Sequence, residues 1–127
     1  MSKQIKYRIL GGYKYLLEEE YLYPTGIALA ARIETDYLAL EVDGVLLIKK
    51  SYAWDGASGP AIDTADFMRG SLVHDALYQL IRLGLLAKKY RKRADQLLRK
   101  ICREDGMPFW RAFYVYRVVR RFGVFVV

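Results

Sequence analysis

The sequence predicts an α+β protein in which an N-terminal antiparallel β meander is followed by three helices. Three observations carry this prediction: a hairpin signal at Asp43-Gly44, a link containing glycine and proline, and helical spacing of apolar residues in the second half. With 127 residues, 54% of them hydrophobic, the chain is long enough to build one core. We therefore expect a single domain over residues 1–127, made of a meander (1–53), a link (54–65) and a helical part (66–127).

The first part of the chain has the composition of β-strands. In the stretch TDYLALEVDGVLLIKKSYAW, two runs rich in leucine, β-branched and aromatic residues are joined by Asp43-Gly44. This dipeptide favours a two-residue type I′ turn, in which both central residues have positive φ. The preceding stretch GIALAARIE predicts another strand, which meets residues 37–42 through a turn at residues 35–36. Antiparallel strands are thus expected over residues 5–53.

The second part reads as helices. Asp63 or Thr64 can cap a first helix that runs from about residue 66 to 83 and ends near Gly84. A second helix is predicted from residue 90 to 105, because its apolar residues recur at i, i+4, i+7, i+8, i+11 and i+12. These residues are Tyr90, Ala94, Leu97, Leu98, Ile101 and Cys102.

A third helix is predicted to begin at Pro108 and to run to about Phe122. Its inner stripe is expected to consist of Phe113, Tyr116, Val119 and Val118.

The charge of the chain is concentrated in its second half. The formal net charge is +7, and residues 82–121 contain thirteen Lys and Arg residues against three acidic ones. Such a surface attracts anionic partners, which include lipid head groups, nucleic acid and acidic proteins. The first ten residues carry Lys and Arg instead of an apolar block, so no signal peptide is expected, and no apolar run has the length of a transmembrane span.

The first predicted helix carries the only histidine, in the stretch LVHDALY. At 100° per residue, His74 and Tyr78 share one side of the helix, whereas Asp75 projects about 100° away from His74. A direct contact between His74 and Asp75 is therefore not expected, and each needs a partner of its own. A buried imidazole needs a partner for its second nitrogen, and Asp95, at the edge of the apolar stripe of the second helix, is the candidate.

Asp75 requires a positive charge to balance it. One option is a hard cation such as Ca²⁺, since Asp55 and the small residues Gly56, Ala57 and Ser58 in the link could add carboxylate and carbonyl oxygens. The other option is an ion pair with an Arg or Lys of the basic helices. Spacing alone favours the ion pair and leaves both options open.

Other chemistry is less well supported by the residues. A metal phosphohydrolase of the His-Asp type needs several histidines, and this chain has one. Ser71 lies within one helical turn of His74, but such neighbours are usually structural, and Cys102 falls on the inner stripe of its helix, as a packing residue would.

The stretches WDGASGP (54–60), LVHDALY (72–78) and RADQLL (93–98), in this order and spacing, resemble a family of bacteriophage and prophage proteins filed as domain of unknown function 1353. The same pattern is similar to that of the secreted and prokaryotic phospholipases A2. In those enzymes, a glycine-containing loop with an aspartate precedes a His-Asp helix, and a second helix supplies an aspartate to the histidine. The disulfides that brace those enzymes have no counterpart here, because Cys102 is the only cysteine.

The resemblance implies a role for each matched residue. His74 would be the general base, Asp95 would orient it, and Tyr78 would belong to the hydrogen-bond network around Asp95. Asp75, Asp55 and the carbonyl of Gly56 would hold Ca²⁺.

Two functions follow as expectations. One is a calcium-dependent, phospholipase A2-like hydrolase that acts on a lipid or another ester during phage infection or lysis, with the basic helices docked on an anionic lipid surface. The alternative is a phage structural or host-interaction protein in which the cluster of His74, Tyr78 and Asp95 is a buried packing network. Nucleic-acid binding is a weaker expectation. The expected location is the host cytoplasm or the virion.

Overall fold

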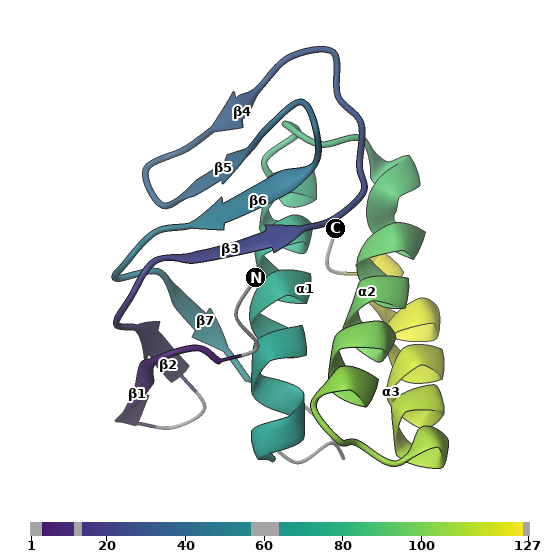
Figure 1. The fold of residues 1–127 in the computed structure, drawn as a ribbon. Coiled ribbons are helices and arrows are strands. Elements are labelled where there is room, and N and C mark those ends of the chain that lie inside the picture. Colours follow the sequence, from purple (N-terminus) through teal and green to yellow (C-terminus); the bar gives the residue numbers. More distant parts are fainter. Residues whose placement is uncertain (1–3, 12–13, 57–63, 126–127) are drawn as a thin grey trace. The chain divides into compact units, whose positions relative to one another are not determined.

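The computed structural model describes residues 4–11, 14–56 and 64–125 (Figure 1). The chain forms two compact units, residues 1–55 and 56–127, and the boundary falls inside the predicted link. The first unit holds antiparallel strands in two sheets and the second holds three helices, so the predicted α+β layout is confirmed. The single-domain organisation stays a prediction.

The described residues of the first unit form seven short strands, and every strand pair among them is antiparallel. Their order is β1-β2-β7 in one sheet and β3-β6-β5-β4 in the other, so β7 and β3 pair with strands that are not their sequence neighbours, unlike in the predicted meander. The bounds are β1 Tyr7–Gly11, β2 Lys14–Leu17, β3 Tyr21–Pro24, β4 Ile33–Glu34, β5 Leu38–Leu40, β6 Val45–Ile48 and β7 Ala53–Asp55.

Side-chain alternation explains why β3 pairs with β6. Tyr21 and Tyr23 are the buried residues of β3, and the register places them opposite Ile48 and Leu46, the buried residues of β6. The pairing thus puts all four apolar side chains on the buried face. The stretch GIALAARIE, in contrast, is a strand only at Ile33–Glu34, a two-residue segment that buries little surface.

The hairpin between β5 and β6 exists, but its turn is not of type I′. The amide of Gly44 donates to the carbonyl of Glu41 and the amide of Glu41 donates to Val45, both at 2.9 Å, which closes a three-residue loop. Gly44 has a φ of 94°, whereas Asp43 has none of the positive φ that a type I′ turn requires. A Cβ atom at position 44 would lie 2.7 Å from the Ile27 carbonyl oxygen, so space also demands glycine.

The helices of the second unit are α1 (Ala65–Arg82), α2 (Arg91–Glu104) and α3 (Phe109–Phe122), close to the predicted bounds. Single 3-10 turns, η1 (Lys88–Tyr90) and η2 (Gly123–Phe125), precede α2 and follow α3. Thr64 occupies the N-cap position of α1, and the other predicted cap, Asp63, lies outside the described residues. No helix within the described ranges is long and apolar enough to cross a membrane.

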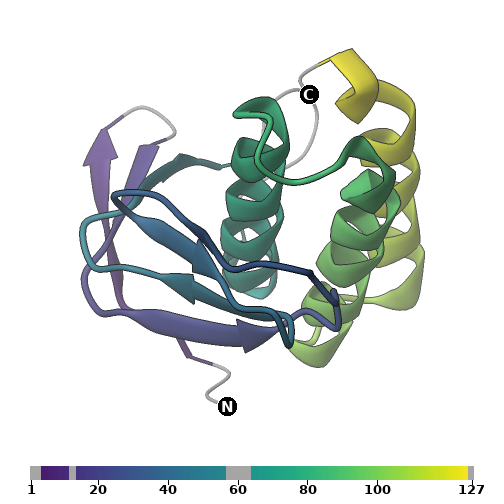
Figure 2. The ribbon, with the colours of Figure 1, turned by 90° about the horizontal axis from the view of Figure 1, so that it is seen from above.

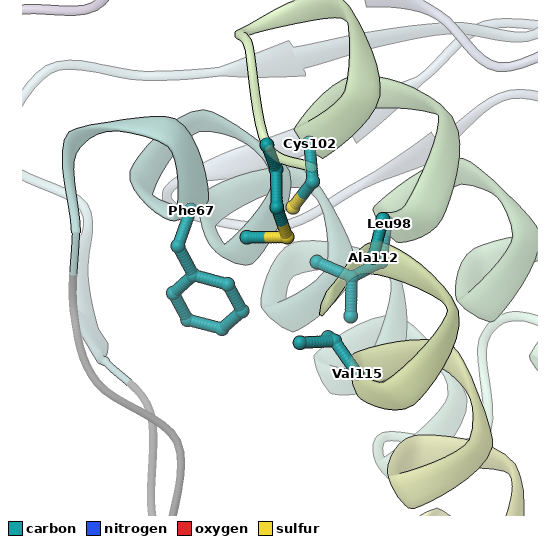
Figure 3. Close-up of a cluster of buried hydrophobic side chains, with 6 residues drawn as sticks. Phe67, Leu98, Cys102, Ala112 and Val115 are labelled. Carbon is teal, nitrogen blue, oxygen red and sulfur yellow. The ribbon is translucent and has the colours of Figure 1, made fainter. Parts of the chain in front are cut away.

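The helix α2 packs against both α1 and α3 (Figures 1 and 2). The three helices meet at a cluster of buried side chains (Figure 3), which consists of Phe67, Leu98, Cys102, Met107, Ala112 and Val115. The residues that α3 contributes to this cluster are small.

The predicted inner stripe of α3 is therefore wrong for Phe113, which is 43% exposed. Ala112 and Val115 face the core, with Val119 packed against it. Phe67 and Met107 already supply the bulky side chains of the cluster, so the face of α3 that fits there is the one with small residues.

Candidate functional site

The side chains of His74 and Tyr78 lie one helical turn apart in α1 and converge on Asp95 of α2. The imidazole Nε2 of His74 lies 2.8 Å from Oδ1 of Asp95, and the Tyr78 hydroxyl donates to the same oxygen at 2.6 Å. The two rings are 4.0 Å apart between centroids. His74 is 7% exposed and Asp95 is fully buried, so this hydrogen-bonded group is shielded from water.

Two arginines hold the other oxygen of Asp95. Nη1 of Arg120, in α3, donates to Oδ2 at 2.8 Å, and Nη1 of Arg91 lies 3.4 Å from the same oxygen. Burial by itself would raise the pKa of Asp95, but the hydrogen bonds from His74, Tyr78 and Arg120 outweigh it and the pKa is lowered. Asp95 is thus a buried carboxylate that remains charged, with donors from all three helices.

Arg91 also binds the end of α3. Its guanidinium donates to the carbonyl of Val119 at 3.1 Å and to the carbonyl of Arg120 at 3.2 Å. These carbonyls belong to the last turn of α3, where the helix itself leaves carbonyl groups without partners. Arg91 therefore links the C-terminal end of α3 to the Asp95 carboxylate.

The structure also brings His74 and Asp75 together, which the helical wheel did not lead us to expect. Nδ1 of His74 lies 3.7 Å from Oδ1 of Asp75, because the imidazole extends toward the neighbouring position. The expectation of wholly separate partners is wrong, since the ring lies between two carboxylates. Burial alone would lower the pKa of His74, but Asp75 and Asp95 outweigh it and the pKa is raised.

This arrangement sets the protonation pattern of the ring. When the ring is neutral, the closer carboxylate, Asp95 at Nε2, favours the tautomer that carries its proton on Nε2, so Nδ1 is the nitrogen that gains and loses a proton. Tyr78 keeps its proton, because burial first and the Asp95 carboxylate second raise its pKa well above the ordinary value. The chemistry available here is proton transfer at Nδ1, with Asp95 stabilising the charged imidazolium.

The candidate metal ligands are divided between the two units. Asp75 belongs to α1 and its side chain is 35% exposed, whereas Asp55 ends β7 and lies 3.6 Å from the ammonium of Lys14. Gly56 follows Asp55, and Ala57 and Ser58 lie outside the described residues. Within the described ranges, no three His, Cys, Asp or Glu side chains group so as to hold a metal ion. Carboxylate and carbonyl oxygens, the groups that these residues carry, are ligands that Ca²⁺ prefers.

The cysteine is not a candidate nucleophile. Cys102 is fully buried, and burial raises the pKa of its thiol to about 12, with the charges of Asp66 and Asp105 adding to the effect. At neutral pH, the reactive thiolate is therefore almost absent. Ser71 is also buried, at 4% exposure.

Sequence reasoning missed both arginines of the site. Arg91 and Arg120 were counted within the basic surface of residues 82–121, although Arg91 stands four residues before Asp95. This i, i+4 spacing of opposite charges was the available signal for Arg91. Arg120 is distant in sequence and could be found only from the packing of α3.

The fold and the site define an α+β protein with one buried histidine held by an aspartate from a neighbouring helix. Within that class, the chain belongs to the family described as protein of unknown function (DUF1353), whose model matches residues 31–119. The match contains His74, Asp75, Tyr78, Arg91 and Asp95 and ends just before Arg120. No curated protein and no solved structure matches the chain.

Proposed function

We propose that the protein is a phospholipase A2-like hydrolase that cleaves a lipid or another ester. One observation carries the proposal: Nε2 of His74 is held by Asp95 at 2.8 Å, while Nδ1, on the opposite side of the ring, lies near the partly exposed Asp75. A general base needs one nitrogen fixed by an acceptor and the other available for a proton. Asp95, Tyr78 and the two arginines supply a rigid support for the fixed nitrogen.

In the proposed reaction, Nδ1 of His74 accepts a proton from a water molecule while the water oxygen attacks the ester carbonyl. The Asp95 carboxylate, bonded to Nε2, stabilises the imidazolium that forms. Collapse of the tetrahedral intermediate breaks the bond to the leaving alkoxide, which takes the proton from Nδ1. The products are a carboxylic acid and an alcohol, and His74 returns to its neutral form.

Calcium is part of this proposal: its ligands would be the carboxylates of Asp75 and Asp55 and the carbonyl oxygen of Gly56. When bound, the ion would polarise the ester carbonyl. Asp75 is also the carboxylate that lies beside Nδ1 of His74, so substitution of Asp75 should affect both calcium binding and the basicity of His74.

The resemblance to phage and prophage proteins supports a role in infection or lysis. The proposed location is accordingly the host cytoplasm or the virion, and the proposed partner of the basic helices is an anionic lipid surface or a phage or host protein. Nucleic acid ranks below these partners.

A second candidate function is a phage structural or host-interaction protein without enzymatic activity. It is favoured by the 7% exposure of His74, since a general base must be reached by its substrate. It is also favoured by the hydrogen bonding of buried polar atoms. Within the described ranges, no buried side-chain nitrogen or oxygen lacks a hydrogen-bond partner. In this function the cluster fixes the packing of three helices.

Release of fatty acid from phospholipid vesicles, with calcium or with a chelator, distinguishes the two functions. If the protein is a hydrolase, His74→Asn abolishes release, Asp75→Asn lowers release and weakens its stimulation by calcium, and the exposed-site control Lys89→Gln leaves release unchanged. Calorimetric titration of wild type and Asp75→Asn with calcium measures the ion directly. If the wild type releases no product from any ester and His74→Asn lowers the stability of the protein, the non-enzymatic packing function is supported and the hydrolase is rejected.

A further inference from the structure

The outer face of α3 is unusually rich in exposed aromatic residues. Phe109 and Trp110 are 69% and 70% exposed, and Phe113 and Tyr114 are 43% and 48% exposed. At 100° per residue, these side chains lie on the side of the helix opposite Ala112 and Val115. Arg117 and Arg121 are exposed on the same side. We call these six residues the outer face of α3.

On this face the aromatic residues occupy the first turns of α3 and the arginines the later turns. The guanidinium of Arg117 lies 5.9 Å from the centroid of the Phe113 ring, and the Phe109 and Phe113 rings stack at 6.3 Å. No acidic residue occurs from position 106 to the end of the chain. Arg120 is bound to Asp95 and Arg111 to Thr64, so Arg117 and Arg121 carry the exposed charge of α3.

We propose that the outer face of α3 docks on the surface of an anionic phospholipid membrane. Trp, Tyr and Phe rings are favoured at the boundary between head groups and acyl chains, where an apolar body and a polar edge are both accommodated. Guanidinium groups beside them reach the phosphates, and the negative surface potential of an anionic membrane attracts them. A single helix face with both kinds of group matches the two layers of that boundary.

The charge pattern favours a membrane over the other partners of such a face. A second copy of the chain, joined through the same face by two-fold symmetry, would supply no acidic residue of that face to pair with the arginines. Duplex nucleic acid would neutralise the arginines but would leave the rings of Phe109 and Trp110 in water. Single-stranded nucleic acid would need open ring faces, and the Phe113 ring is already in contact with Phe109 and Arg117.

This inference rests on the proposed function only in naming a lipid as the surface that the protein meets. Binding is therefore measured without hydrolysis, on vesicles of ether-linked phospholipids, which contain no ester to cleave, in the presence of a chelator. Binding to these vesicles can hold when the hydrolase assay fails, and hydrolysis of a soluble ester can hold when binding fails.

Trp110 gives a readout at the proposed surface. The chain has two tryptophans, and Trp54 is 4% exposed, so the Trp54→Phe variant leaves Trp110 as the single emitter. On vesicles that contain phosphatidylglycerol, we expect a blue shift of the Trp110 emission and quenching by brominated acyl chains. On vesicles of phosphatidylcholine alone, we expect neither.

Two pairs of substitutions test the surface by co-sedimentation with the anionic vesicles. Phe109→Ala with Trp110→Ala, and Arg117→Gln with Arg121→Gln, should each weaken binding at least tenfold. The matched control is Lys88→Gln with Lys89→Gln, which removes two exposed charges outside α3 and should weaken binding less than threefold.

Three results would overturn the inference. The first is an absence of binding to anionic vesicles by the wild type. The second is an equal loss of binding in the Lys88/Lys89 control, since this would assign binding to net charge. The third is a Trp110 shift produced by single-stranded DNA, or by self-association at rising protein concentration, but not by vesicles.

Discussion

The Arg120 side chain donates to Oδ2 of Asp95 at 2.8 Å and thereby joins the last turn of α3 to the carboxylate that holds His74. The side chain of Asp95 is fully buried and that of Arg120 is 30% exposed, so the pair lies at the margin of the core. The charge of Asp95 is thus balanced by Arg120 of α3 as well as by Arg91 of α2. The stability of the helical unit should consequently depend on this pair.

Replacement of Arg120 by Gln should destabilise the protein by about 1–3 kcal/mol, because it removes a charged hydrogen bond from a buried carboxylate. The free energy of unfolding is measured by urea denaturation. The neighbouring variant Arg121→Gln, which alters an exposed side chain, should change it by less than about 0.5 kcal/mol. Equal effects of the two substitutions would show that the Arg120 pair contributes nothing specific.

Acid should weaken the protein through Asp95. Its pKa is lower in the folded state than the ordinary value of 3.8, so its stabilising contribution is complete above that pH and is lost as the pH falls toward the folded-state value. The difference in unfolding free energy between wild type and Asp95→Asn should therefore shrink below about pH 4, whereas any change near neutrality belongs to His74, whose raised pKa depends in part on Asp95. A difference that does not change down to pH 2 would contradict a lowered pKa.

Gly123 should not tolerate a side chain. A Cβ atom at this position would collide with the Tyr78 hydroxyl and lie 2.9 Å from Nη1 of Arg91. The substitution Gly123→Ala is allowed by the backbone φ of −60° and gains up to about 1 kcal/mol of helix propensity. We expect the collision to outweigh this gain, with a net loss of about 1–3 kcal/mol.

A double-mutant cycle assigns that loss to the hydroxyl. In a Tyr78→Phe background, Gly123→Ala should cost less than in the wild type, by at least about 0.5 kcal/mol. Strict additivity of the two substitutions would place the collision elsewhere.

Cys102 should be inert in the folded protein. Because the thiol is fully buried and its pKa is raised to about 12, it should not react with a disulfide reagent at pH 8 within minutes. Addition of denaturing urea should make it react at the rate of a free thiol. Rapid reaction of the native protein would mean that the cluster around Cys102 opens readily.

Much of the site could be predicted from local spacing. The i, i+4 spacing placed Tyr78 beside His74, and the position of Asp95 on the edge of an apolar stripe placed a carboxylate where α2 faces its neighbour. These inferences depend on helical periodicity alone, which a sequence displays directly. The roles of the site residues in catalysis and metal binding stay predictions.

The remaining features depend on packing, which local patterns do not determine. Phe113 was expected in the core because it shares a helical stripe with Tyr116 and Val119, yet Phe67 and Met107 occupy the space that it would need. Similarly, Asp43-Gly44 indicated the hairpin but not its turn, because the contact of Gly44 with Ile27 depends on a distant segment. The pairing of β7 with β2 joins residues nearly forty positions apart and has no local signal.

The contacts of Arg91 and Arg120 at the end of α3 allow that helix only one rotational setting. Arg91 binds the backbone carbonyl of Arg120, while the side chain of Arg120 binds Asp95. A slip of α3 by one residue would turn it by about 100° and separate the Arg120 side chain from Asp95. The same slip would change the direction in which Trp110 points. The contacts of Arg91 and Arg120 therefore balance the charge of the carboxylate that holds His74 and also set the direction in which the aromatic rings of α3 point.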